Sequence, residues 1–251
     1  VDIVVEQCEQ DGLEPMSINP VVGECNDSRI NQIQKRVVGA DEVRQAFASA
    51  SEEFEEGDVG AGAGTICYGL KGGIGSASRV IRIGEKEYTI GVLVQSNFGA
   101  TEDFVLNGES VGAKILDWKQ EKDDMAASEE DKGSIMSILA TDLPLTSRQL
   151  RRILRRTGVG IARTGGYTGH GSGEVMIGFT TANRIPSGAE EELLQIQAIP
   201  EHVINRAFLA AAEAEQEAIL NSMTAAERTR GQAGELYYSL SEYLEDQDSK
   251  Q

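Results

Sequence analysis

The alternation of apolar and polar residues along the chain predicts β-strands interleaved with a few amphipathic helices. Two strands joined by a hairpin turn at Gly84-Glu-Lys-Glu87 are typical of an antiparallel pair. Strand-length apolar runs are expected at 1–5, 79–83, 88–96, 135–141, 159–164 and 175–181.

Three segments have the spacing of helices. Asp41 is the expected N-cap of a helix with apolar residues at 43, 46, 47, 50 and 54, which Gly57 ends. A basic helix is expected over 147–157, with Thr146 and Gln149 as a capping box and Gly158 as its C-terminal stop. The third helix starts with Pro200 at its first position and extends to about residue 221, and the tail from about 240 is expected to fray.

Two glycine-rich stretches, 57–75 and 158–173, leave strands in hairpin order rather than at strand-to-helix crossovers. The pattern therefore favours an α/β protein with one sheet packed on another and helices outside, over a doubly wound parallel sheet. We expect a single domain over residues 1–251, with the charged stretch 117–132 as an exposed linker.

Charge and composition exclude several classes of protein. The chain has 41 acidic and 23 basic side chains, a net charge of −18, which argues against binding to nucleic acids or anionic membranes. Three cysteines without metal-ligand spacing and two histidines predict neither a disulfide scaffold nor a metal site. No apolar run is long enough to span a membrane. Because the chain begins with Val1, we expect a sequence incomplete at its N-terminus, which leaves a targeting signal open; a cytoplasmic location is predicted.

The common catalytic motifs do not identify a function for this sequence. The glycine clusters contain neither the dinucleotide-binding nor the phosphate-loop pattern, and no G-x-S-x-G elbow occurs. A hydrolase using Ser172 with His170 as its base stays possible, since both lie on one loop, whereas His202 is expected at the surface of a helix.

The junction Gly133-Ser134 offers a different nucleophile. A serine that opens a buried strand directly after a charged stretch and a glycine has the position of an N-terminal nucleophile created by self-cleavage. The freed α-amine, whose ordinary pKa is about 7.7–8.0, can then serve as the base for the hydroxyl. The alternative is that Gly-Ser is merely a turn.

Several blocks resemble the DmpA family of L-aminopeptidase/D-esterases and β-peptidyl aminopeptidases. The resemblance covers nearly the whole chain in the family's order. The blocks that carry it are Pro20–Asn31, Tyr68–Arg79, Gly91–Gly99, Gly133–Leu145, Arg148–Ile153, Gly160–Gly165, Gly171–Glu174 and Phe179–Asn183.

The resemblance implies a role for each matching residue. Ser134 would be the autoproteolytic site and nucleophile, splitting the chain into segments 1–133 and 134–251. Ser172 and Glu174 would hydrogen-bond around the nucleophile and orient its amine, and Asn97 would donate to the oxyanion. Glu24 would meet the free amino group of the substrate.

Two departures from the family pattern accompany these matches. Asn26 stands where members often have an aromatic residue, so it is a candidate substrate contact of altered shape. Members of the family also carry a long segment before the region that corresponds to Val1 of this sequence.

The resulting prediction is an αββα sandwich hydrolase of the N-terminal-nucleophile type, acting on peptides, amides or esters. No cofactor or metal is expected, and the resemblance implies an oligomer of cleaved heterodimers. The rival interpretations are the Ser172/His170 hydrolase and an uncleaved, non-catalytic binding or scaffold protein with the same fold.

Overall fold

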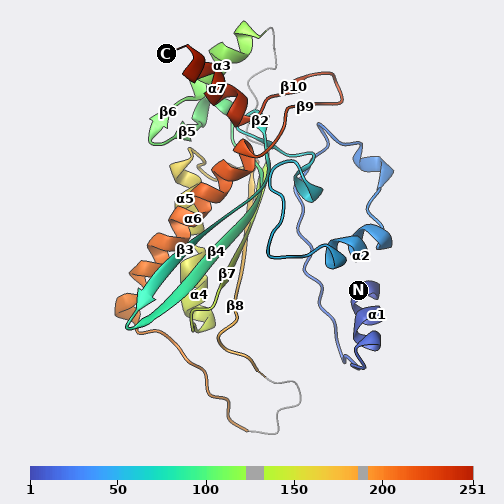
Figure 1. The fold of residues 1–251 in the computed structure, drawn as a ribbon, viewed down its shortest axis with the longest axis vertical. Coiled ribbons are helices and arrows are strands. Elements are labelled where there is room, and N and C mark those ends of the chain that lie inside the picture. Colours follow the sequence, from blue (N-terminus) through green and yellow to red (C-terminus); the bar gives the residue numbers. More distant parts are fainter. Residues whose placement is uncertain (123–132, 186–191, 251) are drawn as a thin grey trace.

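A four-stranded mixed sheet is the centre of the computed structural model, which describes residues 1–122, 133–185 and 192–250. Its strands are β3 (Gly73–Ile83), β4 (Lys86–Asn97), β7 (Ser134–Thr141) and β8 (Gly173–Thr180), in that spatial order. The first three are antiparallel, and β8 runs parallel to β7 (Figure 1). The predicted strands at 79–83, 88–96, 135–141 and 175–181 are therefore confirmed, with β3 and β4 longer than expected.

The hairpin between β3 and β4 follows from its turn residues. Ile83 pairs with Lys86, so two residues form the loop, and Gly84 has a φ of +64°. Glycine adopts this left-handed conformation without a steric penalty, which is why such turns suit two-residue hairpins.

Helices lie on one face of the sheet. α6 (Asn205–Thr224) packs against β3 and β4, and α5 (Thr157–Arg163) packs against α6. The remaining helices and short strands are α1 (Asp2–Gln10), α2 (Ala40–Ala48), α3 (Gly112–Glu121), α4 (Ser147–Leu154), α7 (Leu240–Ser249), β1 (Ile66–Cys67), β2 (Leu70–Lys71), β5 (Val105–Leu106), β6 (Glu109–Ser110), β9 (Thr229–Arg230) and β10 (Leu236–Tyr237). Single 3-10 turns occur at Ile33–Lys35, Gly60–Gly62, Thr101–Asp103 and Glu201–Val203.

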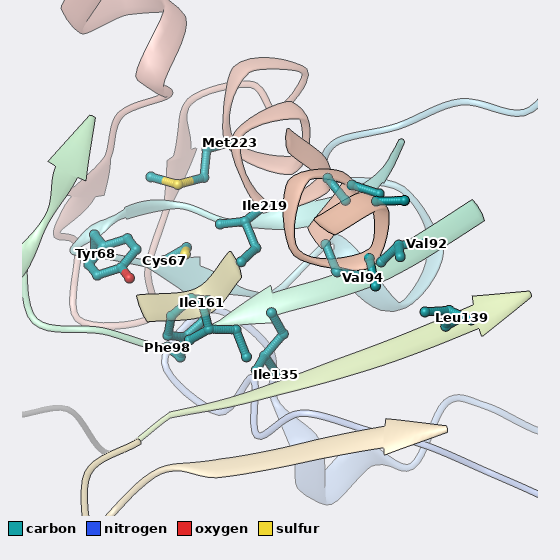
Figure 2. Packing of buried hydrophobic residues seen from close by; sticks show 14 of the residues in the cluster. Cys67, Tyr68, Val92, Val94, Phe98, Ile135, Leu139, Ile161, Ile219 and Met223 are labelled. Atoms are coloured by element: carbon teal, nitrogen blue, oxygen red, sulfur yellow. The ribbon is translucent and has the colours of Figure 1, made fainter. Parts of the chain in front are cut away.

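The main core fills the space between the sheet and α6, as Figure 2 shows for Val92, Val94 and Ile219. Glycine lets the layers approach closely. A Cβ at Gly75 on β3 would lie 2.1 Å from the carbonyl oxygen of Ala218 on α6. Burial of this apolar surface, at about 25 cal/mol per Å², is the main force that holds the helix on the sheet.

One carboxyl lies in this core. Glu215 on α6 has no exposed surface, and its Oε1 accepts a hydrogen bond of 2.5 Å from the Ser137 hydroxyl on β7. Its Oε2 has no hydrogen-bond partner in the part of the chain that the structure describes. Burial raises the pKa of Glu215 to about 7, because the charged form loses its hydration.

The opposite face of the sheet is uncovered over much of its area. Ile138, Val175 and Phe179 are 38%, 47% and 51% exposed. The described ranges form the one four-stranded sheet and two-stranded hairpins, so the second large sheet of the expected sandwich is not among them.

The N-terminal region differs from the sequence prediction. The expected buried strand 1–5 is wrong, because residues 2–10 form α1, none of them buried. A helix satisfies its backbone groups within the segment, whereas a strand needs a neighbour. The helix expected from Asp41 exists as α2, but Gly39 is its N-cap, it ends at Ala48, and it buries no residue.

The strand expected at 159–164 is also wrong. This stretch lies in α5, so Gly158 does not end a helix. A Cβ at Gly160 would lie 2.6 Å from the Ala212 carbonyl oxygen, so glycine here permits close packing of α5 on α6. The basic helix keeps its predicted capping box, Thr146 with Gln149, but ends at Leu154.

Two segments expected to be exposed are ordered helices. Residues 117–121 of the expected linker belong to α3, with Trp118 and Lys119 buried; 123–132 lie outside the described residues. The tail expected to fray forms α7, capped by Ser239, with Leu240 and Tyr243 buried. The third predicted helix is present as α6, which starts at Asn205 after a 3-10 turn.

Candidate active site

Strand pairing brings three of the predicted site segments side by side. Asn97 at the end of β4 pairs with Ser134 at the start of β7, and Ser134 pairs with Gly173 at the start of β8. Three segments that are far apart in sequence thus meet at one edge of the sheet. The junction Gly133-Ser134 lies at the middle strand of the three.

The junction is tightly seated by backbone atoms. The carbonyl oxygen of Gly133 accepts a hydrogen bond of 3.1 Å from the N–H of Gly173. A Cβ at Gly133 would lie 1.9 Å from the Asn97 carbonyl oxygen and 2.7 Å from the Phe98 Cα. Since a real Cβ cannot approach backbone so closely, this position requires glycine.

Alternation along the strands fixes the face of the sheet on which the nucleophile lies. Ser137 on β7 contacts α6 through Glu215, so Ser134, three residues earlier, faces away from α6. Ser96 on β4 contacts Ser222 of α6, so Asn97 also faces away from it. Asn97 and Ser134 therefore share one face.

The side-chain amide of Asn97 is held at both ends. Its Oδ1 accepts a hydrogen bond of 2.9 Å from the N–H of Ile66, and its Nδ2 donates to the carbonyl oxygen of Asn26 at 3.1 Å. The residue is 7% exposed. Because an amide nitrogen carries two hydrogens, one N–H of Asn97 is not used by the Asn26 contact.

A buried lysine supports the loop that contacts Asn97. Lys71 has no exposed surface, and its Nζ donates to the carbonyl oxygens of Gly62, Thr65 and Gly72 at 2.8, 3.1 and 2.8 Å. Burial lowers the pKa of Lys71 to about 8. These bonds tie together the loop that presents the Ile66 N–H.

The loop over residues 24–26 lies on the same site. Its middle residue, Cys25, is 6% exposed, and its single S–H lies within reach of two carbonyl oxygens, with Sγ 3.5 Å from that of Ser134 and 3.7 Å from that of Gln95. Burial raises the pKa of the Cys25 thiol, so the sulfur is a neutral donor here. Its neighbours in sequence, Glu24 and Asn26, are exposed.

Ser172 and Glu174 flank the residue that pairs with the nucleophile. The Ser172 Oγ is buried and has no hydrogen-bond partner within the described residues. Glu174 is half-buried and pairs with Ile135, so strand alternation directs its side chain to the face opposite that of Ser134. Ser172 and Glu174 thus both adjoin Gly173, the residue that pairs with Ser134, and the Glu174 side chain does not share the face of the Ser134 side chain.

The rival pair Ser172 and His170 is not assembled. His170 is exposed in the turn before β8, and the unpartnered Ser172 Oγ means that the two side chains share no hydrogen bond in this structure. A serine nucleophile and its base need such contact. His202 is exposed in the 3-10 turn before α6.

No cluster of three or more His, Cys, Asp or Glu side chains able to hold a metal ion occurs among the described ranges. Within the same ranges, no helix has the length and apolar character needed to cross a membrane.

Sequence reasoning missed the residues that support the site. Ile66 and Lys71 act through hydrogen bonds to or from backbone groups, and no local pattern announces such contacts. The sequence prediction treats Cys25 only as one of three cysteines, although a cysteine beside the predicted substrate carboxylate Glu24 is a signal that could have identified it.

Comparisons with known proteins agree with this architecture. Residues 1–237 match the model of peptidase family S58. The chain is 36% identical over 220 residues to the beta-peptidyl aminopeptidase BapA of Sphingosinicella xenopeptidilytica, covering 84% of this chain and 55% of that protein. It thus spans little more than half the length of that curated relative.

Two solved structures are similar over most of the chain. The PH0078 protein of Pyrococcus horikoshii is 44% identical, with a TM-score of 0.85 over 97% of this chain and 66% of that one. The L-aminopeptidase D-Ala-esterase/amidase of Ochrobactrum anthropi, a variant of the Ntn-hydrolase fold, is 35% identical, with a TM-score of 0.78 over 88% of this chain and 60% of that one. The predicted α/β fold of the N-terminal-nucleophile-hydrolase type and the family resemblance are confirmed, with one large sheet of the expected sandwich among the described residues. The chain belongs to peptidase family S58.

Proposed function

We propose that this chain is a serine aminopeptidase that activates itself by cleaving the bond between Gly133 and Ser134. The observation that carries the proposal is the register that aligns Asn97, Ser134 and Gly173 across three strands. It gathers a hydroxyl, a side-chain amide and a scissile peptide bond at one edge of the sheet. Relatives with aminopeptidase activity in their names support the same assignment.

The proposed activation is an acyl shift followed by hydrolysis. The Ser134 Oγ attacks the carbonyl carbon of Gly133 and passes its proton to the leaving Ser134 nitrogen. The C–N bond breaks, and an ester joins Gly133 to the Ser134 oxygen. Water then cleaves the ester, which leaves a carboxylate on Gly133 and a free hydroxyl and α-amine on Ser134.

In turnover, the new α-amine of Ser134 accepts the proton of its own hydroxyl. The second N–H of Asn97, which the contact with Asn26 does not use, lies on the same side of the sheet as Ser134 and is suited to the developing oxyanion. Neutral donors fixed at both ends, like this amide, need little reorganisation when charge develops. Ser172, whose buried hydroxyl lacks a partner among the described residues, is available to hold the amine, with Glu174 two residues on.

We assign Glu24 to the amino group of the substrate. Its carboxylate is exposed, and the next residue along the chain is Cys25, whose thiol contacts the Ser134 carbonyl. A carboxylate there would pair with the ammonium of an unblocked peptide, amide or ester. Asn26 would border the same pocket. We also expect the cleaved chains to assemble as an oligomer of heterodimers.

The decisive experiment is the intact mass of the purified protein, beside the Ser134→Ala variant. Two fragments, the second beginning Ser134-Ile-Met, are expected for the wild type and one chain for the variant. Ser110→Ala is the matched control, because this exposed serine on β6 lies outside the site. A wild-type chain that stays whole would overturn the proposal and favour the uncleaved scaffold protein.

A further inference from the structure

We propose that the backbone N–H of Gly173 is the oxyanion donor of the self-cleavage step. This inference rests on the proposed function and adds a catalytic group to it. The group is a main-chain amide of β8, supplied by strand pairing rather than by any side chain.

The geometry places this amide on the reacting atom itself. In the uncut chain, the Gly173 N–H donates to the carbonyl oxygen of Gly133 with an N···O distance of 3.1 Å. That oxygen belongs to the peptide bond that Ser134 attacks. The distance is within the range of an ordinary hydrogen bond, so the donor is in place before the reaction begins.

The chemistry requires a donor at this atom. When the Ser134 oxygen adds to the Gly133 carbon, the electron pair of the C=O bond moves onto the oxygen. The resulting tetrahedral anion collapses by expelling the Ser134 nitrogen, which takes up the proton from the attacking hydroxyl. A donor that is already aligned stabilises the anion more than the neutral carbonyl, and so lowers the barrier.

Asn97 is less well placed to perform this role alone in the precursor. One of its N–H groups is committed to the carbonyl oxygen of Asn26. The carbonyl oxygen of Asn97 packs against the Gly133 backbone and offers no donor. The Gly173 amide is the donor to the scissile oxygen that the structure records.

This hydrogen bond is not needed to hold the sheet together. It is the first hydrogen bond of the parallel ladder, whose pairs run from Ser134 with Gly173 to Thr141 with Thr180. A hydrogen bond at the end of a ladder can be removed while the remaining pairs keep their register. The amide of Gly173 can therefore be tested without unfolding the strand.

The test replaces Gly173 by glycolic acid, so that an ester oxygen stands where the N–H was. The matched control replaces Ile177 by its α-hydroxy acid, because every second residue from Gly173 to Thr181 directs its N–H to β7 and Ile177 lies away from the junction. Each chain is refolded, its fold is checked by circular dichroism, and cleavage after Gly133 is followed by intact mass.

We expect the Gly173 replacement to slow cleavage by about 10²- to 10³-fold, the usual effect of removing one oxyanion donor. The Ile177 replacement should cleave within a few-fold of the wild type. A folded Gly173 replacement that cleaves as fast as the control would overturn the inference and leave the proposed function standing. A wild-type chain that never cleaves would overturn both.

A second measurement applies if the Gly173 replacement does not fold. In the Ser134→Ala precursor, the Gly173 amide is expected to exchange its hydrogen slowly, since it is bonded to the Gly133 carbonyl. A measurable scalar coupling across that hydrogen bond would support the assignment. Exchange at the rate of a free amide would overturn it.

Discussion

Glu215 provides a stringent test of the packing between α6 and the sheet. Its carboxyl is buried with one hydrogen bond, from Ser137, and its pKa is raised to about 7 from an ordinary value of 4.5. The unfolded chain therefore loses this proton near pH 4.5, while the folded chain keeps it until about pH 7. The stabilising contribution of the protonated carboxyl is full below pH 4.5 and is lost as the pH rises through 7.

The magnitude follows from the size of the pKa change. Each pKa unit corresponds to about 1.4 kcal/mol, so the ionised carboxyl destabilises the folded protein by about 3 kcal/mol. Glu215→Gln removes the charge but keeps an oxygen that can accept from Ser137. We expect the difference in unfolding free energy between variant and wild type to increase by about 3 kcal/mol from pH 4.5 to pH 8, in favour of the variant.

Urea unfolding measures this difference through the fluorescence of Trp118, the single tryptophan, which is 3% exposed. All variants carry Ser134→Ala, so that the unfolding chain is in one piece. Glu217→Gln is the matched control on the same helix, because its side chain is 48% exposed and pairs with Arg79 at the surface. A difference between Glu215→Gln and wild type that does not change with pH would refute the burial argument.

Four further predictions concern other parts of the molecule. Lys71→Met should destabilise the fold by about 3 kcal/mol, since buried carbonyls left without a donor cost about 1–3 kcal/mol each. Because the pKa of Lys71 is lowered to about 8 in the folded protein, the stability of the wild type should rise from pH 8 to 10.5, whereas that of the variant should not. Urea titrations at several pH values would detect this difference. Gly75→Ala should lower the free energy of unfolding by about 1–3 kcal/mol, because its Cβ would clash with α6. Gly91→Ala is the control and should change stability far less, because the nearest atom to its Cβ would be the Ala140 carbonyl oxygen at 3.9 Å. Equal urea midpoints for the two variants would contradict the close packing of Gly75 on α6. In the cleaved enzyme, Asn97→Ala should lower kcat for an aminoacyl p-nitroanilide by about 10²- to 10³-fold. Glu24→Gln should instead mainly raise KM. If Glu24→Gln lowered kcat without changing KM, its contact with the substrate amine would be refuted.

The sequence predicted the sheet better than the helices and the periphery. Alternating branched residues define β4 and β7 because a half-buried strand requires that pattern. The stretch 159–164 was misassigned because its apolar residues suit a strand, while its conformation is decided by contact of Gly160 with α6. That contact is between segments more than 50 residues apart, so no local window contains it.

The site could be predicted as a set of residues but not as an arrangement. Asn97, Ser134 and Ser172 were found through multi-residue blocks, and the register then showed which backbone groups lie between them. Sequence reasoning gave Gly173 no role of its own, because a glycine between two polar residues has no side chain to suggest one. Its amide becomes meaningful only when the partner strand is known.

Gly133, which precedes the nucleophile, and Gly173, which pairs with it, differ in why glycine suits each position. Gly133 is required by space, since any Cβ would overlap the Asn97 carbonyl. At Gly173 a Cβ would still be 3.8 Å from the Ser134 Cβ, so space alone does not demand glycine there. The first glycine lets the scissile bond lie against the neighbouring strand, and that position aligns its carbonyl with the amide of the second. Close packing on one side of β7 and a hydrogen bond on the other therefore hold the same peptide bond, and a change at either side should affect self-cleavage before it affects the fold.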